Sequence, residues 1–304
     1  VNPHANTNIP RTESLDDAEL MFIQTRWRAL PDAQMEPIDR FLKAGKPVIG
    51  LRTATHAFKA QPAVHKKIRA YLRDASKADD PDSVPLPDIA AEEWGAFDHY
   101  GDGYTGPMQE WRDGFGRLVV GERWVSHHGK HKHESAKGVI AAEAADHPVL
   151  RGVDRDSIWS AADVYTVRLP LPGDSMPLVH GKVMARAGEY DEEDALYGMR
   201  PSDAEPVEGK NDPMMPIAWT KSYQLPEGAK GRVFSTTMGT STDLLEAGVR
   251  QMLLNAVFWV LGDEAAIPAE GVMSDLAGDY APTKFYNHPP EYWQQRAAMP
   301  SDFR

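Results

Sequence analysis

Arg52 and His56 lie four residues apart, directly after a short apolar run that is typical of a buried strand. A guanidinium is a fixed cation, and imidazole exchanges a proton near neutral pH. Together they could polarise a carbonyl or hydroxyl oxygen while a proton moves. We therefore predict an acid/base site with His56 as proton carrier and Arg52 as its partner. The structural alternative is that Arg52 pairs with a buried carboxylate and His56 caps a following helix.

Threonine hydroxyls surround this pair and the end of a second strand. Thr53 and Thr55 share the loop of Arg52 and are expected to bind the oxygen that is polarised. Neither has an adjacent base, so the sequence does not favour a threonine nucleophile. A second loop, residues 236–243, follows another apolar run. We expect Thr237 and Thr240 in that loop to form the opposite wall of the site.

The segment from Ser126 to Glu134 holds four of the 11 histidines. Imidazole nitrogens suit zinc or iron, so the His127–His133 cluster could serve a metal-dependent hydrolase. Lys130 and Lys132 stand among these histidines and would repel a cation. We favour a solvated loop beside the site, with His128 contacting substrate and without a bound metal or cofactor.

Aromatic and polar side chains mix between Trp94 and Tyr104. Aromatic faces stack on the C–H faces of sugar rings, while polar neighbours bind the hydroxyls. The alternative is a small aromatic core under a loop. Asp163 and Tyr165 lie at a predicted strand, where packing is the alternative to substrate contact, and Arg26 follows the first strand. We predict that Trp94, Tyr104, Asp163 and Tyr165 bind substrate.

The elements that must position these residues begin with a strand–helix–strand unit. We expect a buried strand over Leu20–Thr25, a helix from Asp32 through Ala44 that ends at Gly45, and a strand over Val48–Leu51. Such a unit implies parallel strands joined by a right-handed crossover.

A similar pattern returns near the C-terminus. A strand followed by a turn, over Gly231–Gly239, precedes Asp243 and Glu246. We interpret these two residues as a capping box for a helix over Leu244–Leu261, which Gly262 closes. Open α/β sheets bind ligands beyond the carboxyl ends of their strands, so the loops after two of these strands should meet. Shorter strands are expected over Gly138–Ala142, Val164–Val167, Met176–Lys182 and Pro216–Thr220.

Composition excludes several classes of protein. The 304 residues carry a net charge of −12 and no concentrated basic face, which argues against a nucleic-acid partner. No apolar run approaches the roughly 18 residues of a spanning helix, so we expect a soluble chain without a membrane partner. Zero cysteines exclude disulfides, thiolate metal sites and a cysteine nucleophile. No signal peptide is visible, and processed secretion or a periplasmic location remains open.

The segment from Ala44 to Phe58 reads AGKPVIGLRTATHAF and resembles the ThuA-like (trehalose utilisation) family. That resemblance implies a class I glutamine amidotransferase-like, flavodoxin-related fold: three layers, a mostly parallel central sheet and insertions. It also implies a role in carbohydrate utilisation, with a sugar or keto-sugar as partner. Further agreement in order and spacing comes from His147–Val153, Asp163–Tyr165, Pro216–Thr220, Gly231–Gly239 and Asn255–Trp259.

Two departures from the family qualify the resemblance, and one residue difference separates the chain from glutamine amidotransferases. Amidotransferases hold a cysteine where Arg52 stands, so glutamine hydrolysis through a thioester is excluded. A Gly-His pair common in the family reads Gly239-Thr240 here. Family members usually carry an upstream strand–helix–strand, so we expect a fragment whose exposed edge is covered by a homodimer partner or a further N-terminal segment.

Residues 1–262 are expected to form the α/β domain, and residues 263–304 an extended tail packed on it. The leading hypothesis is a sugar-processing isomerase, lyase or hydrolase that works by acid/base chemistry. The rivals are a non-catalytic carbohydrate-binding or scaffold module and the metal-dependent hydrolase.

Overall fold

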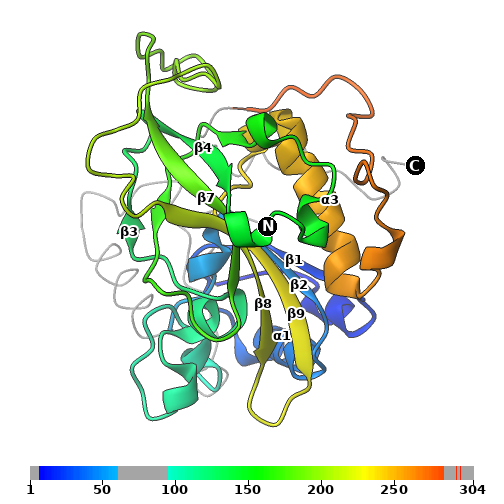
Figure 1. The fold of residues 1–304 in the computed structure, drawn as a ribbon. Coiled ribbons are helices and arrows are strands. Elements are labelled where there is room, and N and C mark those ends of the chain that lie inside the picture. The colour runs from blue at the N-terminus through cyan, green and yellow to red at the C-terminus, as the bar shows by residue number, and fades with distance from the viewer. Residues whose placement is uncertain (1–6, 61–94, 284–291, 293–294, 296–304) are drawn as a thin grey trace, which may run out of the picture.

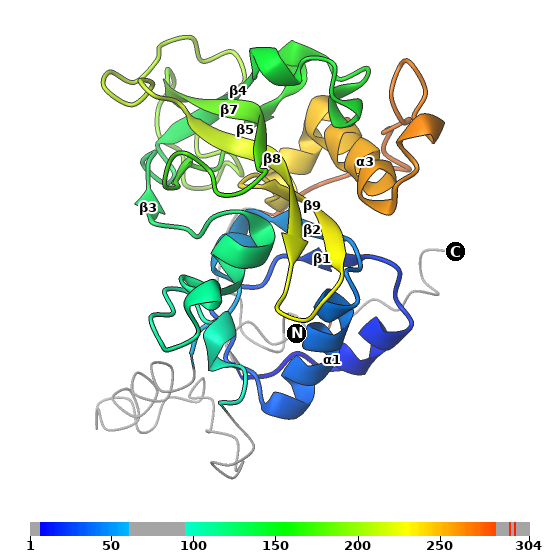
Figure 2. The same cartoon turned by 60° about the horizontal axis from the view of Figure 1, so that its bottom comes forward.

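A computed structural model describes residues 7–60, 95–283, 292 and 295 of the chain. A seven-stranded sheet has the order β1-β2-β9-β8-β7-β4-β5, and β3 pairs with β6 beside it. In Figure 2 helix α3 lies on one face of the parallel strands, over β2 and β9, and helix α1 lies on the other face. The elements are β1 (Met21–Ile23), α1 (Asp32–Lys43), β2 (Val48–Leu51), β3 (Ser126–His127), β4 (Glu134–Ile140), β5 (Trp159–Ser160), β6 (Tyr165–Thr166), β7 (Met176–Ala185), β8 (Met215–Gln224), β9 (Lys230–Thr236) and α3 (Ala247–Leu261).

The sheet is mixed, and the prediction of a mostly parallel sheet is wrong. Strands β1, β2 and β9 run parallel, whereas the pairs β9–β8, β8–β7, β7–β4 and β4–β5 are antiparallel. Residues 225–229 alone join β8 to β9, and so short a connection can only return the chain antiparallel. Apolar runs in a sequence show where strands lie and not which way they point.

The first strand–helix–strand unit is confirmed. Met21 pairs with Val48 in a parallel ladder, and α1 crosses between the two strands. The helix starts at Asp32, but that carboxylate accepts from the backbone N–H of Ala96 and not from the first turn of the helix. Gly45 follows the C-terminus of α1 at a φ of 69°, and a Cβ there would lie 2.8 Å from the backbone oxygen of Lys230 in β9. The helix buries Met35, Ile38, Phe41 and Leu42 on one face.

Strand β1 is an end strand of the described sheet. Met21 and Ile23 are buried against the α1 layer, while Phe22 is 54% exposed on the opposite face. The predicted buried strand is therefore half-buried, because a strand at a sheet edge has one neighbour only. The prediction that a homodimer partner or a further segment covers this edge stays a prediction.

Helix α3 begins three residues later than predicted, at Ala247. The predicted capping box of Asp243 with Glu246 is wrong, because the side chain of Asp243 bonds upstream. It forms a capping box with Thr240 on the short 3₁₀ helix Ser241–Leu245. Leu245, expected inside the helix, is consequently 39% exposed. Gly262 ends α3 in the left-handed conformation, as predicted.

The chain after α3 runs back along that helix, as Figure 1 shows. The side chain of Gln251 donates to the carbonyl of Glu270, and Asn255 accepts from the backbone N–H of Val272. These bonds fasten the described part of the tail to the helix. Within the described residues, no helix has the length and apolar composition needed to cross a membrane.

Candidate functional site

Three loops meet at the carboxyl edge of β1, β2 and β9. The side chain of Gln24 donates to the carbonyl of Gly239 at 2.7 Å, and Thr53 donates to the carbonyl of Gln24 at 2.7 Å. The backbone N–H of Arg52 donates to the carbonyl of Met238 at 3.0 Å. Parallel strands place their carboxyl ends at one edge, so the predicted meeting of these loops is confirmed.

Arg52 occupies the sharp turn after β2. Its φ is 42°, in the left-handed region that a residue with a side chain rarely adopts. Gly239 faces this turn, and a Cβ there would lie 3.1 Å from the Cβ of Leu51. Backbone strain of this kind concentrates at functional sites, which supports the turn as part of one.

Arg52 is paired with a buried carboxylate. Its Nη2 donates to Oδ1 of Asp163 at 2.8 Å, while Nη1 donates to the carbonyls of Asp163 and Thr237 at 2.8 and 3.0 Å. Side-chain exposure is 8% for Arg52 and 0% for Asp163. The guanidinium carbon also lies 3.9 Å from the ring centroid of Tyr165. These contacts agree with the structural alternative, in which Arg52 pairs with a buried carboxylate. The guanidinium binds Asp163 and packs on the ring of Tyr165.

Asp163 also binds two imidazoles. His127 Nδ1 lies 2.5 Å from Oδ2, and His131 Nδ1 lies 3.1 Å from Oδ1. Burial raises the pKa of Asp163, but the hydrogen bond from His131, the charge of Arg52 and the contacts with His127 lower it to about 2. In a neutral imidazole, a carboxylate at Nδ1 favours the tautomer with the proton on that nitrogen, which leaves the lone pair on Nε2. The side chain of His127 is 53% exposed, and its contact with Asp163 fixes the orientation of the ring, as an oriented base requires.

His56 lies within a group of aromatic rings. Its ring centroid is 5.3 Å from Trp27, 5.4 Å from Trp124 and 5.9 Å from Tyr165, and its Nδ1 is 3.1 Å from the hydroxyl of Thr55. Burial lowers the pKa of His56 from 6.5 to about 3, and the charges of Arg26, Arg52, His127 and Arg123 add to this effect. An imidazole that stays neutral at pH 7 is a weak base and a competent hydrogen-bond donor. We call His56 and the residues gathered around Asp163 the Arg52 cluster: Arg52, His56, His127, His131, Asp163 and Tyr165.

Acid should destabilise the protein through its buried histidines. The pKa of His56 is lowered to about 3 and that of His147 to about 4, both mainly by burial, from 6.5. Below pH 6.5 these two histidines therefore bind protons in the unfolded chain but stay neutral in the folded chain. The contribution of these histidines to the free energy of unfolding is complete above pH 6.5. It declines as the pH falls toward their pKa values in the folded protein. Between pH 6 and pH 4 we expect His56 alone to remove about 2 kcal/mol from the free energy of unfolding.

Urea denaturation at pH 7, 6, 5 and 4 measures this decline. His56→Gln should flatten the curve, whereas His133→Gln, outside the cluster, should preserve most of the slope. If the free energy of unfolding of His56→Gln fell with pH as steeply as that of the unaltered protein, the pKa of His56 would not be lowered in the folded protein.

The predicted threonines lie at the turn, where most of them are buried or bonded to neighbouring groups of the protein. Thr55 and Thr237 are 1% and 2% exposed. The hydroxyl of Thr240 pairs with that of Thr242 at 2.9 Å. His128 is directed elsewhere, since its Nε2 lies 2.7 Å from the carbonyl of Lys210. Their predicted substrate contacts stay predictions.

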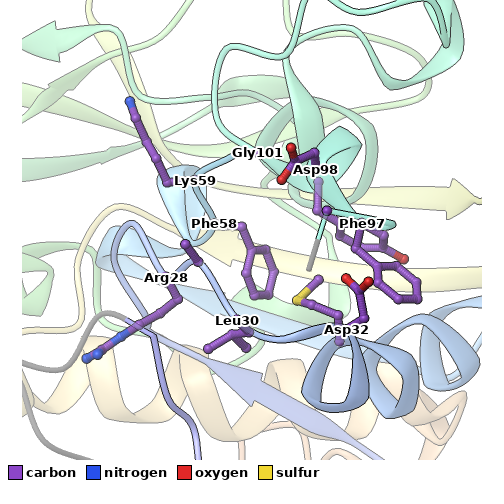
Figure 3. A pocket seen from close by; sticks show the side chains of 12 residues that line it. Arg28, Leu30, Asp32, Phe58, Lys59, Phe97, Asp98 and Gly101 are labelled. Carbon is purple, nitrogen blue, oxygen red and sulfur yellow. The ribbon is translucent and has the colours of Figure 1, made fainter. Parts of the chain in front are cut away.

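The aromatic patch lies apart from the Arg52 cluster. Tyr100 is 1% exposed and donates to Asp39 at 2.9 Å, and Tyr104 is half-buried against the same core, which favours the aromatic-core alternative. Trp94 lies outside the described residues. The patch borders a small, open hollow, and none of the described residues among the predicted site residues lines it. Figure 3 shows Arg28 and Lys59 on one side of this hollow, and Asp32 and Asp98 on the other.

Sequence reasoning missed three side chains of this region. The sequence suggests His127 only as a metal ligand that could share a site with His131, and it carries no signal for the contact of His127 with Asp163. Trp27 and Trp124 carried no motif, and the fold alone brings them to His56. Among the described residues, no three His, Asp or Glu side chains are grouped to hold a metal ion.

Asp243 does not cap α3. Its side chain instead holds the loop after β9. Its carboxylate accepts from the backbone N–H groups of Gly239 and Thr240 at 2.7 and 2.9 Å, and from the hydroxyl of Ser160 at 2.6 Å. Asp243 is 1% exposed, so water could not replace these hydrogen bonds if the carboxylate were removed.

Asp243→Asn should lower the free energy of unfolding by about 1–3 kcal/mol, because an amide cannot accept at both carboxylate positions. Thermal and urea denaturation measure the loss. Asp263→Asn, on the exposed turn after α3, is the matched control and should change stability little. Equal stability of the two variants would contradict the assigned role of Asp243.

A protein-family model described as ThuA, trehalose utilisation, matches residues 99–260 of the chain. The match covers Asp163, Tyr165, His127 and the loop after β9, and it begins after the Arg52 turn. A search of curated proteins found no match.

Proposed function

Because the chain belongs to the ThuA (trehalose utilisation) family, we propose that it binds a sugar or keto-sugar at the Arg52 cluster and transfers a proton on it. The family match supports carbohydrate as the substrate class. The observation that carries the site is the hydrogen bond between His127 and buried Asp163, at the edge where the carboxyl ends of β1, β2 and β9 meet.

Each group of the cluster has a role in such a transfer. Asp163, with its pKa lowered to about 2, stays charged and orients His127. His127 Nε2 takes a proton from the carbon beside a keto group, and the electron pair moves onto the carbonyl oxygen as an enediolate. Neutral His56 donates a hydrogen bond to that oxygen. A proton then moves from the hydroxyl group of the first carbon to this oxygen, which transfers the negative charge to the oxygen of the first carbon. Return of the proton from His127 to the former carbonyl carbon forms the new carbonyl group on the first carbon and completes an isomerisation.

The original assignment of His56 as the proton carrier remains a competing form of the same proposal. A base with a pKa of about 3 accepts a proton poorly at pH 7, which favours His127. Arg52 has its fork occupied, so we assign it to holding Asp163 in place. The non-catalytic binding module is the rival function, and it shares the site but not the proton transfer.

Deuterium exchange in D₂O tests the proposal directly. Neutral sugars, keto-sugars, sugar acids and sugar phosphates are first screened by thermal shift. Compounds that bind are then incubated with the protein, and NMR follows exchange at the carbon next to the carbonyl. Exchange supports proton transfer, and binding without exchange supports the binding module. If no compound in the panel binds, the proposed function is wrong.

A further inference from the structure

Two cations beside Trp27 have no acidic partner among the residues that the structure describes. The exposed guanidinium of Arg26 lies 5.4 Å from the ring centroid of Trp27, and Nζ of Lys59 lies 5.9 Å from the same centroid. In the described part of the chain, neither forms a salt bridge or hydrogen bond through its side chain. This is a local excess of positive charge in a chain whose net charge is −12.

Arg123 and Asp163, two other charged residues of this region, have partners of opposite charge or imidazole partners. Arg123 pairs with Asp102 at 2.7 Å and with Asp113 at 3.6 Å. Asp163, the carboxylate of the cluster, already accepts from Arg52, His127 and His131. The carboxylates are thus occupied, while the charges of Arg26 and Lys59 remain uncompensated.

Hydrogen-bond donors are also in excess here. The buried indole N–H groups of Trp27 and Trp124 have no partner among the described residues, and neither does the buried hydroxyl of Thr25. Unpaired buried donors are costly and call for an explanation. Carboxylate and phosphate oxygens only accept hydrogen bonds at neutral pH, so an anionic ligand suits a site with spare donors.

The charge of Arg26 acts on the same face as the candidate chemistry. After burial, it is the next cause that lowers the pKa of His56, and it also opposes the rise that burial causes in the pKa of Tyr165. A group held by Arg26 would therefore lie within electrostatic reach of both rings.

We propose that the substrate is an acidic sugar, and that Arg26 binds its carboxylate or phosphate group with Lys59 as a second cation. This inference rests on the proposed function and adds the charge of the substrate to it. A guanidinium binds either anion through two parallel hydrogen bonds. Because Arg26 is exposed, it is free to meet a ligand without first giving up another partner.

Isothermal titration calorimetry on matched ligands tests the inference. The ligands are glucose, glucuronate and glucose 6-phosphate, together with the corresponding keto-sugars, and acetate and inorganic phosphate are the sugar-free anions. We expect an acidic sugar to bind more tightly than its neutral counterpart, with an affinity that falls as salt rises. Comparing glucuronate with glucose 6-phosphate separates carboxylate from phosphate recognition.

Arg26→Gln should weaken binding of the acidic sugar roughly ten- to hundredfold and leave neutral sugars unchanged. Arg155→Gln is the matched control, since Arg155 is exposed on a distant 3₁₀ helix. Neutral sugars that bind as tightly as acidic ones, or an Arg26→Gln variant with full affinity for the acidic sugar, would overturn the inference and leave the proposed function standing. Arg26-dependent binding of the sugar-free anions without any sugar binding would reject the proposed function and the acidic-sugar assignment, and retain only the anion site.

Discussion

Arg52→Met should lower the free energy of unfolding by about 3–5 kcal/mol, the cost of leaving a buried carboxylate without its cation. Asp163 has 0% side-chain exposure, so water cannot replace the guanidinium. The substitution also removes the bonds from Nη1 to two backbone carbonyls and the packing on Tyr165. Urea denaturation followed by circular dichroism measures the loss.

Two further variants make this result specific to the pair. Arg155→Met, at an exposed site, should leave stability nearly unchanged. The double variant Arg52→Met, Asp163→Asn should be less destabilised than the sum of its single substitutions, because the uncompensated charge is gone. A small loss in Arg52→Met, or strict additivity in the double variant, would mean that the ion pair does not hold this part of the fold together.

His127→Gln should reduce the rate of proton exchange on an accepted keto-sugar by roughly 10²–10⁴-fold, with a smaller change in KM. Glutamine can still donate a hydrogen bond to Asp163, but it has no nitrogen lone pair that takes up a proton. The measurement is kcat for deuterium exchange by NMR, after the folded state of the variant is confirmed by circular dichroism.

Two matched variants decide between the histidines. His133 lies in the same segment as His127 but contacts Arg186 and Tyr190, so His133→Gln should keep full exchange. His56→Gln should lower the rate through loss of a hydrogen bond to the substrate oxygen, by less than His127→Gln does. If His56→Gln abolishes exchange and His127→Gln does not, the first assignment of His56 as proton carrier is right.

The two proposals address different properties of one substrate. Asp163 and His127 concern the proton that moves, whereas Arg26 and Lys59 concern the charge that the substrate carries. An acidic sugar that exchanges deuterium, with separate losses in Arg26→Gln and His127→Gln, would support both. Affinity should depend on Arg26, and turnover on His127.

The sequence by itself determined the elements and the family. The strand–helix–strand unit around α1, the end of α3 at Gly262 and the resemblance carried by several short segments depend on residues close to one another in the chain. The absence of cysteine, which excludes a thioester, also needs no structure. Side-chain periodicity and turn residues act over one or two helical turns, so they can be recognised locally.

Only the tertiary structure decided the strand directions and the partners within the site. Arg52 and Asp163 are 111 residues apart in the chain, and the sequence carries no signal that joins them. The lowered pKa of His56 arises from burial and from the charges of Arg26, of Arg52 in its own turn, and of Arg123 and His127, which come from three separate parts of the chain. Desolvation depends on burial, and Coulomb interactions depend on distances in space. For that reason only the tertiary structure favours His127 over His56 as the proposed proton carrier.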